Sequence, residues 1–566
     1  MAIQTYHEAD TGLNTITLGD MLDTQASKYP DHDCMVYPHG AKERYTYTTF
    51  KETCDKLARG FMALGIQPGD KVAIWATNVP EWLLTMFSSA KMGGVLVTVN
   101  TAYKLFETEY LCRQSDSGTL VLIDGYRDVS YIDIIRQLCP ELETSEPGQL
   151  HAAALPELRN VIYVGPRENT PKGMFNFEDL YTLAEQISPV ELAARQDSLS
   201  PHDVINMQYT SGTTGFPKGV QLTHYNILNN GKFIGDCMRF TDAERLCITV
   251  PLFHCFGIVL ATMASVTHGT AMVMVEQFHP VRVMEALDWE RCTAVHGVPT
   301  MFIAMLEHET FNQFKFAHLR TGIMAGSLCP IQVMKRVVSD MHMRHITSVF
   351  GQTECSPGMT QTTVDDSLEL RVSTVGRLLP FCEGKVVDPE SGADCPPDVP
   401  GEIVTRGYHI MKGYYKMPEA TAAAIDENGW LHTGDIGTLD EQGYFRITGR
   451  LKDMIIRGGE NIYPREIEEF LYTHPAVSDV QVIGVPDEKY GEEIMAFVIL
   501  KEGQTAGETE LIEFVKNGLS RYKKPRYVRF IDAFPMTASG KIQKYLLRER
   551  GIEELGVKYE DGYRPD

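Results

Sequence analysis

Small and hydroxyl-bearing residues gather in one stretch of the sequence, and a lysine closes it. Residues 209–219 read YTSGTTGFPKG, after a β-like run at 204–209 and before a segment from residue 223 that begins like a helix. Glycines let backbone N–H groups approach oxygen atoms closely, hydroxyls donate further hydrogen bonds, and Lys218 supplies a positive charge. The stretch therefore predicts a polyphosphate-binding loop between a strand and a helix. The residues that it offers to phosphates are Thr210, Ser211, Gly212, Thr213, Thr214, Gly215 and Lys218.

Two familiar nucleotide-binding loops do not fit this stretch. Pro217 stands where the Walker A pattern G-x-x-x-x-G-K-[ST] requires a glycine. The G-x-G-x-x-G spacing of the Rossmann fingerprint is also missing from it. A flexible surface loop of small residues is the ordinary alternative, and other parts of the chain must decide between the two.

A carboxylate follows a predicted strand further along the chain. The sequence FGQTE at 350–354 places Glu354 directly after a buried-looking run and a glycine. An unpaired carboxylate there would be costly to bury. A Mg²⁺ ion that bridges phosphates would satisfy it, because magnesium prefers hard oxygen ligands and takes few of them from protein. Glu354 is therefore a candidate metal ligand.

Three other segments end predicted apolar strands. His254 lies in PLFHCFG at 251–257, where a histidine among aromatic residues is usually a hydrogen-bonded core residue, although a neutral imidazole also suits an apolar tunnel. The segments GVPTM at 297–301 and MAGS at 324–327 read equally well as ordinary turns. Ligands collect at the carboxyl ends of strands in open α/β sheets, which favours a functional interpretation.

These motifs, together with three near the C-terminus, resemble the adenylate-forming (AMP-binding) superfamily, which includes acyl- and aryl-CoA synthetases, peptide-synthetase adenylation domains and luciferases. The C-terminal motifs are WLHTGD at 430–435, the run from TGRLKD at 448–453 to GGENIYP at 458–464, and PMTASGKIQK at 535–544. The resemblance covers nearly the whole chain in the family's order. The segments 452–464 and 539–544 look most similar to medium-chain acyl-CoA synthetases of the "family member 2" kind and to bacterial fatty acyl-CoA synthetases.

The resemblance implies roles in ATP binding. Glu354 and Thr214 would bind Mg²⁺, and Asp435 would accept hydrogen bonds from the vicinal ribose hydroxyls. Arg450 would contact phosphate or ribose. The residues implied at the adenine site are Gly326, Ser327, Phe350, Gly351, Gln352 and Thr353. Many members have tyrosine where Phe350 stands, so the stacking face is kept and the hydroxyl is lost.

The resemblance also implies how catalysis is divided. Lys541 matches the catalytic lysine, which reaches the carboxylate and the α-phosphate and neutralises charge as it develops. His254 would help to gate the acyl site. Lys452 takes the hinge position, where some relatives have aspartate, and Gly458 and Gly459 would line the coenzyme A tunnel.

The order of predicted elements indicates an α/β protein. Short apolar strands alternate with helices, which predicts parallel sheets covered on both faces. Residues 140–200 read as a decorated connection, residues 257–275 as a buried helix followed by a strand, and residues 376–447 as a small β subdomain. The predicted helices are 47–64, 81–92, 106–115, 464–473 and 509–520. The predicted strands are 71–75, 94–99, 120–123, 246–250, 271–275, 294–297, 321–324, 346–350, 480–485, 494–500 and 526–531.

The family fold implied is a large N-terminal domain of two αβαβα-type subdomains plus a small β subdomain, followed by a smaller, mobile α+β C-terminal domain. The expected boundaries are 1–450 for the ATP- and acyl-binding domain and 451–566 for the domain that carries the catalytic lysine and the coenzyme A tunnel.

Composition limits the classes of partner and compartment. The chain has 566 residues and a net charge of −23, which disfavours nucleic acid as a partner. Its 12 cysteines include no C-x-x-C pair and indicate buried free thiols in a reducing compartment. The N-terminus lacks the pattern of a signal or transit peptide, and no transmembrane segment is predicted. We expect a cytoplasmic protein and leave a homodimer open.

The hypothesis is an ATP-dependent acyl-CoA synthetase for a medium- or long-chain fatty acid, with ATP, Mg²⁺ and coenzyme A as cofactors. An aryl-acid or other carboxylate–CoA ligase on the same scaffold is the main alternative. Val259, Met263, Val298 and Met301 favour an aliphatic pocket. A ligase that loads a carrier protein, a luciferase-type oxygenase and a catalytically dead binding module also remain open.

Overall fold

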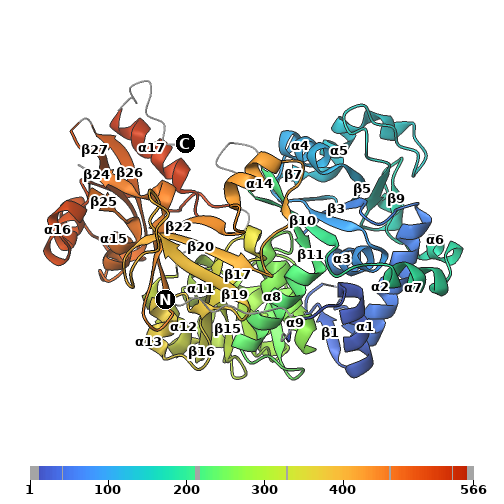
Figure 1. The fold of residues 1–566 in the computed structure, drawn as a ribbon, viewed down its shortest axis with the longest axis horizontal. Coiled ribbons are helices and arrows are strands. Elements are labelled where there is room, and N and C mark those ends of the chain that lie inside the picture. The colour runs from blue at the N-terminus through green and yellow to red at the C-terminus, as the bar shows by residue number, and fades with distance from the viewer. Residues whose placement is uncertain are drawn as a thin grey trace.

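Two large β-sheets and their covering helices form the N-terminal part of the molecule (Figure 1). The structure is a computed structural model that describes residues 12–40, 42–210, 217–326, 329–457, 460–487, 489–537 and 540–556, apart from the side chains of residues 452, 460, 461 and 521. The α/β class predicted from the sequence is confirmed.

The first sheet carries the predicted phosphate loop. Its strand order is β21-β11-β10-β4-β3-β5-β8-β9. The inner strands are parallel, whereas β11 pairs antiparallel with β10 and with β21. Their bounds are β3 Lys71–Trp75, β4 Val95–Thr98, β5 Ser117–Leu122, β8 Asn160–Tyr163, β9 Phe175–Asn176, β10 Val204–Thr210, β11 Lys218–Thr223 and β21 Gly413–Tyr414.

The second sheet draws strands from distant parts of the chain. Its order is β18-β17-β16-β15-β14-β12-β13-β1-β2, so an N-terminal hairpin completes one edge and lies parallel to β13. The bounds are β1 Asp33–Val36, β2 Arg44–Thr46, β12 Arg245–Ile248, β13 Ala271–Met274, β14 Ala294–His296, β15 Thr321–Met324, β16 His345–Gly351, β17 Gly358–Gln361 and β18 Arg377–Leu378.

Helices cover both sheets and share one core between them. The largest buried cluster includes Ile74 of the first sheet, Leu228 of α8 and Ile248 of the second sheet. Burial of such side chains contributes about 25 cal/mol per Å² of apolar surface. The covering helices are α1 Leu18–Lys28, α2 Tyr47–Ala63, α3 Pro80–Met92, α4 Leu105–Ser115, α5 Tyr131–Leu138, α6 Asp179–Leu183, α7 Pro189–Asp197, α8 His224–Cys237, α9 Ala264–His268, α10 Pro280–Trp289, α11 Pro299–Leu306, α12 Ile331–Asp340 and α13 Leu368–Ser373.

Local sequence explains where several helices begin and end. The Thr46 hydroxyl accepts a hydrogen bond from the backbone N–H of Thr49, and the Thr46 N–H donates to the Thr49 hydroxyl, which is a capping box at the start of α2. Gly93 ends α3 with φ +86°, a left-handed conformation that glycine adopts without a Cβ penalty. The apolar run after His254 forms a π-helix, Phe256–Met263, that continues into α9.

The small β subdomain and the C-terminal part follow. The former is the antiparallel sheet β19-β20-β22-β23 with α14 Pro418–Ala424 beside it. The C-terminal part has its own sheet, with order β25-β24-β27-β26 and β28 beside β27, and its own buried cluster. It lies at one end of the molecule in Figure 1, coloured orange to red. The bounds are β19 Cys382–Val387, β20 Gly401–Gly407, β22 Leu431–Leu439, β23 Phe445–Arg450, β24 Ile455–Arg457, β25 Glu460–Ile462, β26 Val477–Asp487, β27 Gly491–Leu500, β28 Tyr527–Phe530, α15 Pro464–Leu471, α16 Glu508–Gly518 and α17 Lys544–Leu555.

Three features differ from the sequence-based expectation. The sheets are mixed rather than purely parallel, because hairpins complete their edges. Lys218 begins β11 instead of leading directly into a helix. Residues 140–200 are more than a connection, since β8 and β9 extend the first sheet. Among the described residues, no helix is long and apolar enough to cross a membrane.

Candidate active site

The predicted phosphate loop joins two antiparallel strands. Thr210 at the end of β10 lies opposite Lys218 at the start of β11, so the loop leaves and re-enters the sheet at one point. The hydroxyl of Tyr110 on α4 donates to the carbonyl of Pro217 at 3.0 Å and supports the base of the loop. Ser211, Gly212, Thr213, Thr214 and Gly215 lie outside the described residues, and their predicted roles stay predictions.

Glu354 and Lys218 meet at a tyrosine. Glu354 lies in a 3₁₀ turn after β16, and its Oε1 accepts from the Tyr414 hydroxyl at 2.8 Å and from Thr210 Oγ1 at 3.5 Å. The Lys218 Nζ lies 5.0 Å from the centre of the Tyr414 ring. The structure thus brings the predicted phosphate lysine and the predicted metal ligand to one place.

The chemistry of these groups fits Mg²⁺ held jointly by protein and phosphates. No group of three or more histidine, cysteine, aspartate or glutamate side chains in the described part of the chain could hold a metal alone. Magnesium commonly takes one or two carboxylates and completes its shell with phosphate oxygens and water. Glu354 is such a carboxylate, and Thr210 offers a hydroxyl beside it.

Asp435 and Arg450 face each other across β22 and β23. They are register partners, and the Arg450 Nε donates to Asp435 Oδ1 at 3.1 Å. Asp435 is only 5% exposed, and this burial raises the pKa of its carboxyl, while the charges of Arg450 and Lys541 oppose the rise. A buried carboxylate with one oxygen already oriented by arginine can accept hydrogen bonds from hydroxyls, as the ribose role requires.

Lys541 comes to the same site from the C-terminal part. Its turn is closed by the Lys541 N–H, which donates to Thr537 Oγ1 at 3.0 Å. Gly540 has φ +80°, and a Cβ there would come 2.9 Å from Val298 Cγ2, so glycine lets the turn lie against that segment. Burial lowers the pKa of Lys541, and the negative charges of Asp435 and Glu354 oppose this effect. The ammonium group therefore lies within electrostatic reach of both carboxylates.

His254 is a half-buried group that precedes the π-helix. Its Nδ1 accepts from the backbone N–H of Phe256 at 3.2 Å. Burial, with a smaller effect from the charge of Lys541, lowers the pKa of His254 to about 3. The neighbouring Cys255 thiol lies 3.6 Å from Thr353 Oγ1. The charge of Lys541 thus acts on His254 at the start of the predicted acyl segment.

The segments predicted for adenine and for the acyl chain lie side by side. Gly326 has φ +88°, and a Cβ there would lie 3.0 Å from Val298 Cγ1 and 3.8 Å from the Phe256 ring. Ser327 lies outside the described residues. Gly351 also requires glycine, because a Cβ would clash with the carbonyl oxygen of Pro357.

The other residues predicted for adenine follow Gly351 along the chain. Thr353 is buried, whereas Phe350 and Gln352 are partly exposed. Phe350 packs against the core of the small β subdomain.

The predicted hinge and coenzyme A segment are not tested by the structure. Lys452 lies in a 3₁₀ turn, Leu451–Asp453, but its side chain is outside the description, as are Gly458 and Gly459. Sequence reasoning missed Tyr414. Its only local sign is an aromatic residue after Gly413 in a β-rich segment, which is too common to single out a site.

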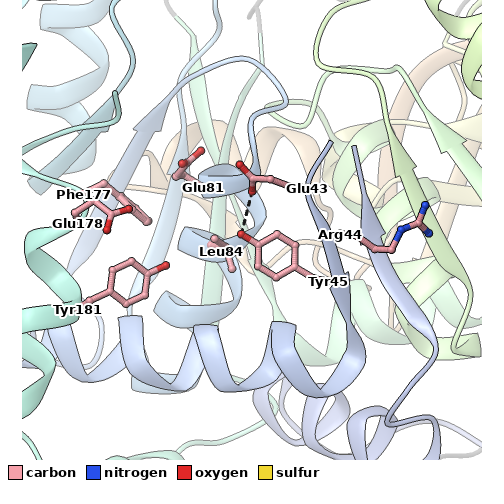
Figure 2. Close-up of a pocket in the computed structure, with 8 residues that line it drawn as sticks. All are labelled: Glu43, Arg44, Tyr45, Glu81, Leu84, Phe177, Glu178 and Tyr181. Atoms are coloured by element: carbon pink, nitrogen blue, oxygen red, sulfur yellow. Dashed lines mark hydrogen bonds between the residues drawn. The ribbon is translucent and has the colours of Figure 1, made fainter. Parts of the chain in front are cut away.

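A pocket of about 370 Å³ lies apart from this site (Figure 2). Its lining residues are Glu43, Arg44, Tyr45, Glu81, Leu84, Phe177, Glu178 and Tyr181, none of which was predicted to act in catalysis. The Tyr45 hydroxyl donates to Glu43 at 3.1 Å. Burial, together with the charges of Glu43 and Glu178, raises the pKa of Glu81 to about 7.

Known proteins match the chain over nearly its full length. The AMP-binding enzyme family matches residues 22–415, and the AMP-binding enzyme C-terminal domain matches residues 466–541. YngI of Bacillus subtilis (strain 168), whose name places it among the acyl-CoA synthetases, is 53% identical over 541 residues, covering 96% of this chain and 98% of YngI. The mitochondrial medium-chain acyl-CoA ligase ACSF2 of Rattus norvegicus is 39% identical over 551 residues, covering 96% of this chain and 89% of the relative. The crystal structure of ATP-bound MatB from Rhodopseudomonas palustris has a TM-score of 0.80 at 28% identity and covers 95% of this chain and 99% of its own.

Proposed function

Because the chain belongs to the AMP-binding enzyme family, we propose that it is an ATP-dependent acyl-CoA synthetase that activates a medium- or long-chain fatty acid. The fatty acid carboxylate attacks the α-phosphate of ATP, which gives acyl-adenylate and pyrophosphate. The thiol of coenzyme A then attacks the acyl carbonyl, which gives the acyl-CoA and releases AMP. The observation that supports the proposal is the convergence of Thr210, Glu354 and Lys218 at Tyr414, with the charge of Glu354 also acting on Lys541.

The residues at the site divide the first half-reaction among them. Lys218 and the loop after Thr210 bind phosphates, and Asp435 orients the ribose. Lys541 neutralises charge as the phosphoryl group is transferred. Glu354 would hold Mg²⁺, which would neutralise phosphate charge when bound.

A change of position of the C-terminal part would serve the second half-reaction. Its contacts with the rest of the chain include polar ones, such as that of the Arg465 guanidinium on α15, which donates to the carbonyl of Ile447 at 2.5 Å. Polar contacts of this kind exchange readily with water. Rotation about Lys452 would withdraw Lys541 and bring Gly458 and Gly459 to the site, as in a hinge mechanism.

The side chains around the strand ends favour an aliphatic acid. Val259, Met263, Val298 and Met301 are all buried and carry no charge or hydrogen-bonding group that would select a polar substrate. The name of the 39% identical relative, a medium-chain acyl-CoA ligase, supports the same substrate class.

Pyrophosphate release tests this function. It is measured with and without coenzyme A, across straight-chain acids from four to eighteen carbons and with benzoate and phenylacetate. We expect a maximum among medium or long straight chains and turnover that requires coenzyme A. Activity with aromatic acids only would indicate an aryl-CoA ligase. Absence of pyrophosphate release with every acid would refute the proposed catalysis.

A further inference from the structure

Tyr414 links the two charged groups of the phosphate site. Its hydroxyl donates to Glu354 Oε1 at 2.8 Å, and its ring lies under the Lys218 ammonium group at 5.0 Å. Among the described residues, Lys218 has no carboxylate and Glu354 has no cation within ion-pair distance. One aromatic side chain therefore contacts both groups that would otherwise attract each other.

The backbone fixes Tyr414 in this position. In β21, Tyr414 is the register partner of Val220 on β11, and its N–H donates to Thr421 Oγ1 at 2.9 Å. The same segment holds Glu354, because the Met411 N–H donates to the Glu354 carbonyl at 2.8 Å. The segment 411–414 thus connects the hairpin that bears Lys218 with the turn that bears Glu354.

The phenol is suited to a permanent donor role. Tyr414 is 8% exposed, and its hydroxyl donates to the neighbouring carboxylate of Glu354. A lysine side chain is flexible, and beside a carboxylate in a half-buried site it would gain from closing the ion pair. A phenol that donates to the carboxylate and offers its ring face to the ammonium satisfies both groups while they stay apart.

We propose, resting on the function proposed above, that Tyr414 is a positioning residue that keeps Lys218 and Glu354 separate and oriented before Mg·ATP binds. Without the Tyr414 hydroxyl, Lys218 and Glu354 form an ion pair with each other. This ion pair must break when the nucleotide binds. The cost falls on nucleotide binding with or without Mg²⁺, because Lys218 must leave Glu354 before it can bind the phosphates.

The test is equilibrium binding of ATP to the full chain by calorimetry, once with excess MgCl₂ and once with EDTA, without fatty acid. We expect Tyr414→Phe to weaken Mg·ATP binding by about tenfold, and to weaken ATP binding in EDTA as well, because Lys218 must leave the ion pair under both conditions. Tyr414→Leu also removes the ring under Lys218, so it should weaken binding under both conditions.

Tyr415→Phe is the matched control. Tyr415 is the next residue, its hydroxyl donates to Asp116 at 2.8 Å, and the Lys416 ammonium lies 5.4 Å from its ring centre. Removal of the Tyr415 hydroxyl should leave the affinity for ATP unchanged both with MgCl₂ and with EDTA. Equal weakening by Tyr415→Phe would show a merely structural role and overturn the proposal, as would no weakening by Tyr414→Phe under either condition.

A double-mutant cycle gives a second measurement. In a Glu354→Gln background, Tyr414→Phe should cause no further loss of Mg·ATP affinity, because the two groups act together. Additive losses would refute the coupling. Absence of acid-dependent pyrophosphate release from the unaltered protein would refute the proposed function instead, since these binding measurements contain no acid.

Discussion

Replacing Lys541 by alanine removes the positive charge that the C-terminal part brings to the site. In the structure Lys541 is half-buried, and the carboxylates of Glu354 and Asp435 oppose the loss of its charge. A lysine that keeps its positive charge can bind the phosphate groups of ATP when they enter the site. We expect Lys541→Ala to impair adenylate formation and to spare the reaction of supplied acyl-adenylate with coenzyme A.

The expected magnitude follows from the burial of this charge. At an effective dielectric constant of about 20, a unit charge 4–5 Å from a transferring phosphoryl group contributes about 3–4 kcal/mol. This energy corresponds to a loss of roughly 10²–10³-fold in the rate of the adenylation step. The loss of one oxyanion-stabilising donor in other enzymes has a similar size.

The assay separates the two half-reactions. Pyrophosphate release from fatty acid and ATP measures the first, and acyl-CoA formation from synthetic acyl-adenylate measures the second. Lys516→Ala is the control, because it removes an exposed lysine of α16 that pairs only with Glu513 among the described residues. Equal losses in both half-reactions of Lys541→Ala would refute a role confined to adenylation, and an unchanged first half-reaction would refute the role itself.

Three other changes test the site and its surroundings. Asp435→Asn should raise the KM for ATP by about tenfold or more while the KM for fatty acid stays within about twofold, because a buried carboxylate loses its acceptor capacity; a matching change in both constants in initial-rate kinetics would contradict this. His254→Phe should leave the shape of the pH profile of kcat/KM unchanged between pH 5 and 8, because a histidine with a pKa of about 3 is neutral throughout; loss of a limb near pH 6.5 would show otherwise. Glu81 has a folded-state pKa raised from 4.5 to about 7, so its contribution to stability is fully present below pH 4.5 and falls as the pH rises to 7. Glu81→Gln should therefore gain stability relative to wild type from pH 4.5 to 8, by up to about 3 kcal/mol in denaturant unfolding, and a constant difference would contradict the buried, protonated state.

Local pattern predicted most strands and helices of the fold. The strands at 71–75 and 321–324 are correct to the residue, because each is an apolar run bounded by a polar or glycine turn. The helix predicted from residue 223 is confirmed as α8, but the strand between Lys218 and this helix was not predicted. The short alternation of Val220 and Leu222 there forms an added strand, which depends on pairing with β10 and β21 rather than on local propensity.

Local sequence pattern predicted less of the candidate active site, because the contacts there join residues that are far apart in the sequence. Tyr414 reaches Glu354 and Lys218, which lie far from it in sequence, and a tyrosine has no spacing rule that reveals this. Lys541 looks like any surface lysine in its own turn. The family resemblance pointed to it, and its position beside Asp435 depends on how the C-terminal part docks.

The N-terminal hairpin has a consequence for the order in which the chain can be assembled. Val36 of β1 pairs with Val273 of β13, about 240 residues later. At typical rates of protein synthesis, roughly 10–50 s pass before the ribosome delivers that partner. Throughout this interval the edge of β1 is unpaired, and an unpaired strand edge is a template for the wrong neighbour. The second sheet therefore closes late, and the first half of the protein cannot complete its fold before the middle of the chain has been made.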